Sequence, residues 1–275
     1  GNTYFADTEG EREMKKLILT AAALLCAATG AQALETSVKP KVTTLGIDAP
    51  KTGLYVGNSF TYYNCGVNGY VRGFTGAAKL DWKARMTTIS AAALAYHDVK
   101  AYLTPHEGDP YFDGKKVPFD VVFLQGQSAE PINKKRSPLF KKYLKQHIET
   151  VRAAGGVPIV VDTWANQDKP QQNRDLADAI ITEANANNAI VLPVGLAFAE
   201  SLKERPDLIL HHTDKRHPSA AGSYLYGAMI YSLLFHKSPE GIDFNGACAK
   251  PLAAADAQYL QKLAWRVTTK FYGWK

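Results

Sequence analysis

The amino-acid sequence predicts an α/β fold of three layers, α/β/α, in which helices cover both faces of a central five-stranded parallel sheet. Apolar runs of strand length alternate with longer segments of helical pattern along the chain. The runs are continuously apolar, as is typical of strands buried on both faces. The polar motifs stand just after these runs or in the loop before Ser219. In a parallel sheet such positions meet at the carboxyl edge, where these folds bind their ligands.

The predicted strands and helices follow one another in regular order. The strands span residues 54–56, 85–90, 120–124, 157–162 and 189–194. The helices span residues 68–80, 138–154, 171–187, 196–204, 220–235 and 253–271. Ser219 is placed as the N-cap of the helix that begins at residue 220, because a serine oxygen there can accept a hydrogen bond from a free backbone N–H.

A secretory signal peptide is predicted over residues 14–33. Met14-Lys-Lys supplies a positive start, Leu17–Ala28 is apolar, and Ala31-Gln-Ala33 is a small-x-small cleavage site. The apolar stretch is too short to span a membrane. Residues 1–13 precede this start and are interpreted as an upstream extension. We therefore expect a periplasmic or secreted protein that is cleaved after Ala33.

The rest of the chain, residues 34–275, is predicted to form one domain. Removing 33 residues from 275 leaves 242, a usual size for a single α/β domain with a substantial core. The formal net charge of +6 is spread along the chain, and the densest cluster, at Lys134-Lys-Arg136, fits the solvated start of a helix. We expect a monomer that binds no nucleic acid, needs no cofactor and does not associate stably with a membrane after cleavage.

Ser59 is the candidate nucleophile. It lies in Leu54-Tyr-Val-Gly-Asn-Ser-Phe-Thr61, where a predicted strand ends in a Gly-Asn turn. Such a turn lifts a side chain out of the carboxyl edge of the sheet. The alternative is an ordinary turn with a capping serine, because Thr61 breaks the Gly-x-Ser-x-Gly pattern of α/β-hydrolases.

Asp214 and His217 are the candidate partners of this serine. They are three residues apart, so one turn of loop or 3₁₀ helix can place both side chains on the same side of the backbone. A serine, an imidazole and an orienting carboxylate form a nucleophilic triad, which is recognised by geometry and role and not by chain order. The alternative is a solvated pair in a surface loop.

Candidate oxyanion donors follow two other strands. Gln125 ends the third predicted strand, and its amide beside Gly126 can offer an N–H to a developing oxyanion. The alternative is a glutamine that only stabilises its loop. Ala91 and Ala92 follow the second strand, and their small side chains would leave a backbone N–H accessible.

The remaining candidates have structural alternatives. Trp164 follows the fourth strand, where it either lines a substrate pocket or packs in the core. No metal site is predicted, because His211 and His212 are adjacent on an extended segment and no cluster of cysteines or carboxylates supports ligation. His97 is interpreted as a structural residue.

Together these motifs resemble those of the SGNH (GDSL-like) hydrolase superfamily. Gly57-Asn-Ser-Phe-Thr61 is similar to its first block, with Asn in place of the Asp of Gly-Asp-Ser. Asp214-x-x-His-Pro-Ser219, followed by Gly222-x-Tyr-Leu225, is similar to its fifth block. The resemblance runs from about Lys51 to Phe235 and implies a flavodoxin-like SGNH fold. It also implies that the serine is the nucleophile, the histidine the general base and then acid, and the aspartate the group that orients the imidazole.

Two blocks depart from the superfamily pattern. The second block normally has a glycine that donates its N–H to the oxyanion, whereas this chain has Ala91 or Ala92. The third block normally carries Gly-x-Asn-Asp, whereas Gln125-Gly-Gln-Ser128 is similar to the Gln-Gly-Glu-Ser of carbohydrate acetylesterases in the superfamily. This similarity implies Gln125 as the amide donor, with Gln127 as the other candidate. It also places Asn58, Gly126 and Gln127 beside the substrate.

The resemblance implies a secreted serine esterase that hydrolyses small acyl esters through an acyl-enzyme. Carbohydrate O-acetyl groups are the favoured substrates, because of the third block. The alternative is a non-catalytic, carbohydrate-binding descendant of the fold, since a fold does not fix a function.

Two cysteines remain after removal of the signal peptide, Cys65 and Cys248. In an oxidising compartment they can pair, which would tie the segment after Ser59 to the segment before the last helix. The alternative is two separate thiols, at least one of them buried.

Overall fold

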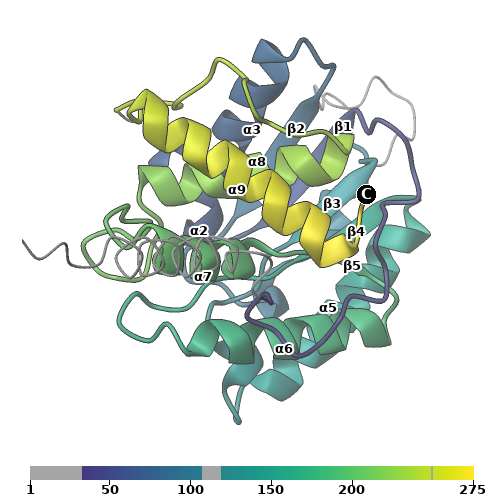
Figure 1. Ribbon diagram of the computed structural model, residues 1–275. Coiled ribbons are helices and arrows are strands. Elements are labelled where there is room, and N and C mark those ends of the chain that lie inside the picture. The colour runs from purple at the N-terminus through teal and green to yellow at the C-terminus, as the bar shows by residue number, and fades with distance from the viewer. Residues whose placement is uncertain (1–32, 107–118, 249) are drawn as a thin grey trace, which may run out of the picture. The chain divides into compact units, whose positions relative to one another are not determined.

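The predicted strands form one parallel sheet in the order β2-β1-β3-β4-β5 (Figure 1). The strands are β1 (Thr52–Gly57), β2 (Lys83–Thr88), β3 (Val121–Leu124), β4 (Val157–Val161) and β5 (Ile190–Leu192). Every residue of β3 and β5 is buried, as expected for strands covered on both faces. The predicted α/β fold is therefore confirmed.

The computed structural model describes residues 33–106, 119–248 and 250–275. Residues Leu34–Lys275 form one compact unit. The predicted upstream extension and all but the last residue of the predicted signal peptide lie outside the described residues, so they stay predictions. None of the helices in the described part of the chain is long and apolar enough to cross a membrane.

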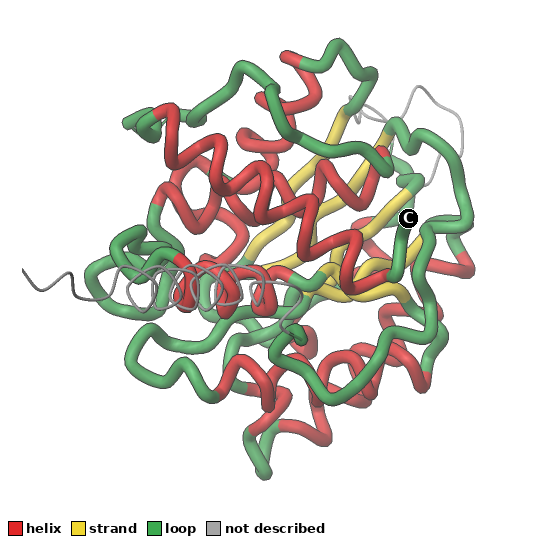
Figure 2. The backbone as a smooth tube through the Cα atoms, viewed as in Figure 1, coloured by secondary structure: helices red, strands yellow, loops and turns green. Residues whose placement is uncertain are grey.

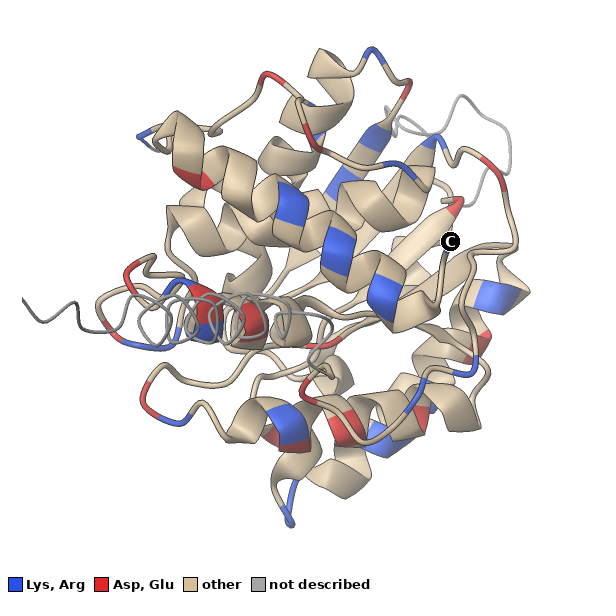
Figure 3. Cartoon of the chain, in the orientation of Figure 1, with Lys and Arg blue, Asp and Glu red and all other residues tan. Residues whose placement is uncertain are grey.

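Helices cover both faces of the sheet, and Figure 2 shows the three layers as helices on either side of the strands. The helices are α2 (Ser59–Tyr62), α3 (Val67–Ala77), α4 (Val99–Tyr102), α5 (Ser137–Ala153), α6 (Gln172–Ala186), α7 (Val194–Glu204), α8 (Ala220–Phe235) and α9 (Ala254–Tyr272). The first layer contains α3, α8 and α9, and the opposite layer contains α5 and α6 (Figure 1). Lys and Arg residues are spread over both layers and the loops (Figure 3).

Helix α8 is buried along almost its whole length. Its sequence is apolar on all sides, so it needs cover from both α3 and α9. A Cβ atom on Gly227 would lie 2.6 Å from Cβ of Tyr70, so this glycine allows α8 to approach α3 closely. The predicted cap is confirmed, because the Ser219 hydroxyl accepts a hydrogen bond from the N–H of Gly222 at 3.2 Å.

The observed elements differ from the predicted ones mainly at their ends. Helix α7 begins at Val194, where the prediction still had strand, because Pro193 ends β5 early. Helices α2 and α4 were not predicted, and each is a single turn capped by a side chain, Asn58 and Asp98 respectively. Such short turns carry no periodic pattern that a sequence could reveal.

From β1 the chain first places β2 on one side and then places β3, β4 and β5 on the other side. The strand order therefore changes direction between β1 and β3, which are neighbours in the sheet. In open parallel sheets this switch point forms a crevice at the carboxyl ends of the strands. β1 ends at Gly57, directly before Ser59, and β3 ends at Leu124, directly before Gln125. The fold therefore brings two of the predicted motifs to the same crevice.

His97 is buried, and its burial predicts that acid destabilises the protein. Its Nδ1 is 3.0 Å from the hydroxyl of Tyr102, and only 5% of the residue is exposed. Burial lowers the pKa of His97 to about 4 from its usual 6.5, because the charged imidazolium would lose its water. The unfolded chain therefore binds a proton on His97 at a higher pH than the folded protein does.

We expect His97 to destabilise the fold as the pH falls from about 6.5 to about 4. The free energy of unfolding should drop by roughly 3 kcal/mol over this range from this residue alone. Urea unfolding of the wild type and of His97→Gln at about pH 7 and about pH 4 measures the difference. His97→Gln should lose less stability on acidification, whereas the exposed-site control His212→Gln should follow the wild type. Equal acid sensitivity in all three proteins would contradict the assignment.

Candidate active site

Ser59 is the first residue of α2 and stands at the carboxyl end of β1. Asn58 caps this short helix, since its side chain accepts a hydrogen bond from the N–H of Phe60 at 3.0 Å. A Cβ atom on Gly57 would lie 2.4 Å from Oε1 of Gln125, so the turn requires glycine for this close approach. The turn leaves Ser59 8% exposed, so its hydroxyl can be reached while its backbone is held.

Asp214 and His217 lie on a loop that closes on itself between α7 and α8. The backbone of His211 pairs with that of Pro218, and the N–H of His212 donates to the carbonyl of His217 at 2.7 Å. Lys215, at the tip, has a φ of 62°, in the left-handed region. The loop therefore carries the imidazole on a narrow, hydrogen-bonded turn and not on a mobile tail.

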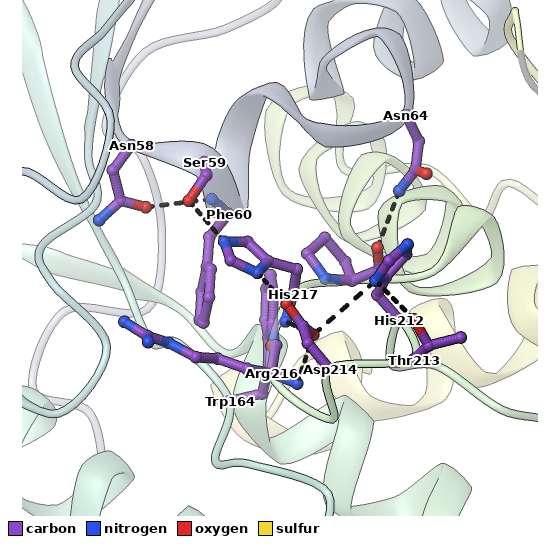
Figure 4. Close-up of polar contacts among 11 residues, drawn as sticks. Asn58, Ser59, Phe60, Asn64, Trp164, His212, Thr213, Asp214, Arg216 and His217 are labelled. Atoms are coloured by element: carbon purple, nitrogen blue, oxygen red, sulfur yellow. Dashed lines mark hydrogen bonds and ion pairs between the residues drawn. The ribbon is translucent and has the colours of Figure 1, made fainter.

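The structure joins the three predicted residues by two hydrogen bonds (Figure 4). Oγ of Ser59 is 2.8 Å from Nε2 of His217, and Nδ1 of His217 is 2.5 Å from Oδ2 of Asp214. The other oxygen of Asp214 accepts the backbone N–H groups of Arg216 and His217 at 2.9 and 3.0 Å. Partial burial alone would raise the pKa of Asp214, but the hydrogen bonds from His217 and the two backbone groups lower it to about 2. The carboxylate therefore stays ionised and orients the imidazole.

Two aromatic side chains that the sequence analysis did not single out hold the His217 ring. Tyr63 stacks on the imidazole, with ring centroids 4.2 Å apart and planes 9° from parallel. Phe60 meets the ring in an edge arrangement at 5.7 Å. Asn64 donates to the carbonyl of Pro218 at 3.0 Å, which fixes its segment to the histidine loop. These residues directly follow the nucleophile, so a helical turn after Ser59 is the signal that could have revealed them.

Of the two alternatives that the sequence left open for Cys65 and Cys248, a disulfide is the one observed. The two residues form a disulfide, with Cα atoms 5.9 Å apart. Asn64 and Cys65 have φ values of 57° and 75°, so the backbone makes two left-handed steps directly after Tyr63. The disulfide therefore anchors the segment that places Tyr63 on the imidazole.

Gln125 does not have the free amide expected of an oxyanion donor. Its Oε1 accepts the N–H of Asn58 at 2.9 Å and the hydroxyl of Thr61 at 2.8 Å, which fixes the orientation of the amide. Its Nε2 then donates to Oδ1 of Asn58 at 3.0 Å and to the carbonyl of Gly126 at 2.5 Å. The side chain is 1% exposed. Gln125 therefore positions the nucleophile turn and does not face a substrate.

Asn58 and Gly126, predicted beside the substrate, are also buried parts of this network. Asn58 donates from Nδ2 to the carbonyl of Ala92 at 3.0 Å, so it connects the loops after β1, β2 and β3. A Cβ atom on Gly126 would lie 3.3 Å from the ring of Phe140, which packs against it. Both residues hold loops together and are not placed to contact a substrate.

Gln127 keeps a free amide group. It is half-buried, and its Oε1 accepts the N–H of Ala129 at 3.1 Å. Within the described part of the chain no group accepts a hydrogen bond from its Nε2. Of the two glutamines that the sequence left open, Gln127 is therefore the one whose amide N–H is not used by a described residue.

Ala91 and Ala92, the two candidate donors after β2, differ in whether the backbone N–H forms a hydrogen bond. Ala92 uses its N–H to close a turn onto the carbonyl of Ile89 at 3.2 Å. Hydrogen bonds between described backbone groups leave the N–H of Ala91 unused. Ala91 has a φ of 58°, in the left-handed region that favours glycine. Ala91 is thus the available donor, in a conformation that costs alanine free energy.

Replacing Ala91 by glycine should relieve this backbone strain. We expect Ala91→Gly to raise the free energy of unfolding by about 1 kcal/mol, the cost of the left-handed region for a residue with a Cβ atom. The melting temperature should rise by about 2–4 °C for a domain of this size. Thermal unfolding followed by circular dichroism measures the shift. Ala93→Gly, at a φ of −81°, is the matched control and should destabilise the protein, as glycine does at ordinary backbone angles. A less stable Ala91→Gly protein would contradict the assignment.

Trp164 is part of the core and supports the catalytic loop. Its ring lies between those of Phe60 and Phe198, at 4.5 and 4.4 Å and nearly parallel to both. Its Nε1 donates to the carbonyl of Arg216 at 3.0 Å. The residue is 1% exposed. The ring thus packs in the core, and Trp164 also belongs to the lining of the neighbouring cleft, so both alternatives that the sequence left open describe it.

A cleft of about 240 Å³ lies between the loops after β3 and β4. Its polar lining consists of Ser128, Asn133, Asn166, Lys169 and Gln172. Its apolar lining includes Trp164. The ring of Trp164 stacks on Phe60, and Phe60 contacts the imidazole of His217, so these two aromatic side chains connect the cleft to the catalytic histidine.

The described residues contain no group of three His, Cys, Asp or Glu side chains that could hold a metal ion. His211 is buried, with Nε2 2.9 Å from the carbonyl of Ala165, whereas His212 is exposed. His211 thus ties the loop after β4 to the loop that carries His217.

Solved structures share this fold. A DUF4886 family protein from Bacteroides uniformis superimposes with a TM-score of 0.61 and 16% sequence identity, covering 82% of this chain and 96% of that protein. A candidate SGNH hydrolase from Slackia heliotrinireducens superimposes with a TM-score of 0.51 and 20% identity, covering 67% of this chain and 99% of that protein. No protein-family model and no curated protein matches the sequence.

Proposed function

We propose that the protein is a secreted serine esterase that hydrolyses small acyl esters. The observation that carries this proposal is the chain of hydrogen bonds from Ser59 through His217 to Asp214, at 2.8 and 2.5 Å. A serine activated by an imidazole that a carboxylate orients is the arrangement of an acyl-transfer enzyme. The fold shared with a candidate SGNH hydrolase supports the same reaction class.

In the proposed reaction Ser59 attacks the ester carbonyl while Nε2 of His217 accepts its proton. His217 then gives this proton to the departing alcohol, and an acyl group remains on Oγ of Ser59. Water, deprotonated by the same imidazole, attacks the acyl-enzyme and releases the acid. Asp214 stabilises the imidazolium in both halves of the reaction without accepting its proton.

Three N–H donors are proposed to stabilise the oxyanion. The backbone N–H of Ser59 lies at the start of α2, where a helix leaves its N–H groups without internal partners. The N–H of Ala91 and the amide of Gln127 are the other two, because both remain unused by the surrounding structure. Each donor contributes on the order of 3 kcal/mol to stabilisation of the transition state.

Carbohydrate O-acetyl esters are the proposed natural substrates. The similarity of Gln125-Gly-Gln-Ser128 to the third block of carbohydrate acetylesterases supports this class. The cleft after β3 and β4, lined by amide and hydroxyl side chains, supports it independently, since such groups bind sugar hydroxyls. The predicted signal peptide supports a location outside the cytoplasm, where such esters are found.

Hydrolysis of p-nitrophenyl esters of increasing acyl length tests the function. We expect turnover to be highest for the acetate and to fall as the acyl chain lengthens. Acetylated xylan and acetylated monosaccharides then test the carbohydrate class, with acetate release as the readout. A protein that hydrolyses none of these esters above the buffer rate would be a non-catalytic member of the fold.

The two glutamines should respond differently to substitution. Gln127→Ala should lower kcat by roughly 10²–10³ with little change in KM, because its Nε2 donates only to the oxyanion. Its stability should change little, because the one bond lost to a described residue is the part-buried contact with the N–H of Ala129. Gln125→Ala should lower the free energy of unfolding by roughly 1–3 kcal/mol, because it leaves buried groups of Asn58 without partners. Steady-state kinetics and urea unfolding of both variants separate the two roles. A wild-type kcat in Gln127→Ala would remove it from the oxyanion hole.

A further inference from the structure

The cleft between the loops after β3 and β4 is fixed to the loop that carries the catalytic histidine. The N–H of Gln167 donates to the carbonyl of Lys215 at 2.8 Å, and Nε1 of Trp164 donates to the carbonyl of Arg216 at 3.0 Å. Nε2 of His211 adds a third connection at the carbonyl of Ala165. The wall formed by the loop after β4 is therefore joined by three hydrogen bonds to the loop that carries His217.

This attachment determines which part of an ester would enter the cleft. His217 protonates the departing alcohol, so the alcohol must lie on the imidazole side of the scissile bond. The cleft adjoins that side through Trp164 and Phe60, whose rings stack at 4.5 Å beside the imidazole. In an acyl-transfer reaction the acyl group is then directed to the other side of Ser59. The cleft is therefore positioned for the alcohol portion.

One cation lines the cleft, and a second lies on the histidine loop that is hydrogen-bonded to it. Lys169 lines the cleft, and the described lining contains no Asp or Glu. Arg216 precedes His217, is exposed, and extends away from Asp214 past the ring of Phe60 (Figure 4). Neither cation forms an ion pair with a described residue. Asp214, two residues before Arg216, is engaged by His217 and two backbone N–H groups.

A third loop adds to this charge. Asn133, which lines the cleft, is followed directly by the exposed run Lys134-Lys-Arg136. Asp168 is an exposed acid beside Lys169, and Glu130 is a buried acid beside the cleft. With the exposed Asp175 of α6, which directly precedes the lining residue Leu176, there are three acids. Five cations lie on three loops, namely Lys134, Lys135, Arg136, Lys169 and Arg216. The surroundings of the cleft therefore favour an anion.

We propose that this cleft binds the alcohol portion of the ester and that this portion carries a carboxylate, held by Lys169 and Arg216. A guanidinium binds a carboxylate through two parallel hydrogen bonds, and an ammonium adds a further donor. The amides of Asn166 and Gln172 remain to bind hydroxyl groups. At about 240 Å³ the cleft is smaller than the roughly 300–1,000 Å³ of pockets for drug-sized ligands, so it takes a single ring, such as an acidic sugar. Assigning the ligand as an alcohol rests on the proposed esterase function.

Binding of a product pair tests the cleft without catalysis. The Ser59→Ala protein is titrated calorimetrically with 4-hydroxybenzoate and with its methyl ester, which share the ring and the hydroxyl and differ in the charged carboxylate. We expect 4-hydroxybenzoate to bind at least about 10-fold more tightly, as two charge-assisted contacts allow. The difference should disappear when Arg216→Gln and Lys169→Gln are added together. Lys83→Gln added together with Lys262→Gln, an equal charge change at the amino end of β2 and on the exposed side of α9, should preserve it.

Hydrolysis of 4-acetoxybenzoate and its methyl ester by the active protein tests the same preference in the reaction. The ratio of their kcat/KM values should fall at least about 10-fold in the Arg216→Gln/Lys169→Gln protein. It should also fall as the salt concentration rises from about 0.01 M to about 1 M, where the Debye length shrinks from about 30 Å to about 3 Å. Because each protein is measured with both esters, their different intrinsic reactivities cancel.

Two results would overturn the proposal. One is equal affinity of the Ser59→Ala protein for the two products, and the other is a difference that survives in the Arg216→Gln/Lys169→Gln background. If the active protein hydrolyses neither ester, the esterase function fails, and the titrations alone still decide whether the cleft binds an anion.

Discussion

Ser59→Ala is expected to abolish ester hydrolysis, with kcat/KM for p-nitrophenyl acetate falling at least ~10³-fold. The hydroxyl is the only part of Ser59 that is lost, and it is the atom bonded to Nε2 of His217 at 2.8 Å. The backbone N–H of residue 59 and the turn around it remain. The loss should therefore appear as a fall in kcat, measured by the release of p-nitrophenolate.

The folding of this variant needs a matched control. Ser232→Ala removes another buried hydroxyl, which donates to the carbonyl of Ala228 inside α8. Both variants should melt within a few degrees of the wild type, but only Ser59→Ala should be inactive. Wild-type turnover by Ser59→Ala would remove the residue from the reaction.

Removal of the disulfide is expected to cause the largest loss of stability. Cys65 and Cys248 are separated by 183 residues, so their bond closes a long loop in the unfolded chain. The double Cys→Ser variant should lose roughly 5 kcal/mol on the chain-entropy model. That is a large part of the roughly 5–15 kcal/mol by which domains are stable. Its melting temperature should fall by at least about 10 °C.

A reductant provides the control for this second prediction. The wild type should melt at a lower temperature in dithiothreitol, whereas the double variant should not respond. Because the disulfide anchors the segment that carries Tyr63, the double variant should also lose kcat on p-nitrophenyl acetate well below its melting temperature. Two free thiols in the denatured, unreduced wild type would contradict the bond.

The sequence was most informative where local patterns decide the structure. Helix α8 begins and ends where it was predicted, because Ser219 caps it and its apolar run is continuous. All five strands were identified from short apolar runs, and their ends shifted by only a few residues. Ser59 could be singled out because it follows a Gly-Asn turn at the end of an apolar run, and Asp214 and His217 because they are three residues apart in the chain.

The sequence did not reveal how side chains near these motifs are oriented. Gln125 and Gln127 both follow β3, and their spacing alone leaves either amide as the oxyanion donor. In the folded protein Gln125 faces Asn58 and Thr61 across the switch point, so its hydrogen bonds are used up. Those partners are more than 60 residues away in the chain, so no local pattern contains them.

The sequence by itself determined the three-layer parallel fold, the residues of the candidate triad and the pair of cysteines. Each of these follows from periodicity, residue type or count, which are properties of the chain. Only the tertiary structure decided that Tyr63 stacks on His217, that Ala91 takes a left-handed conformation, and that Trp164, in the lining of the cleft, donates to the carbonyl of Arg216. These features depend on contacts between loops that follow different strands, and such contacts exist only once the sheet has brought the loops to one edge.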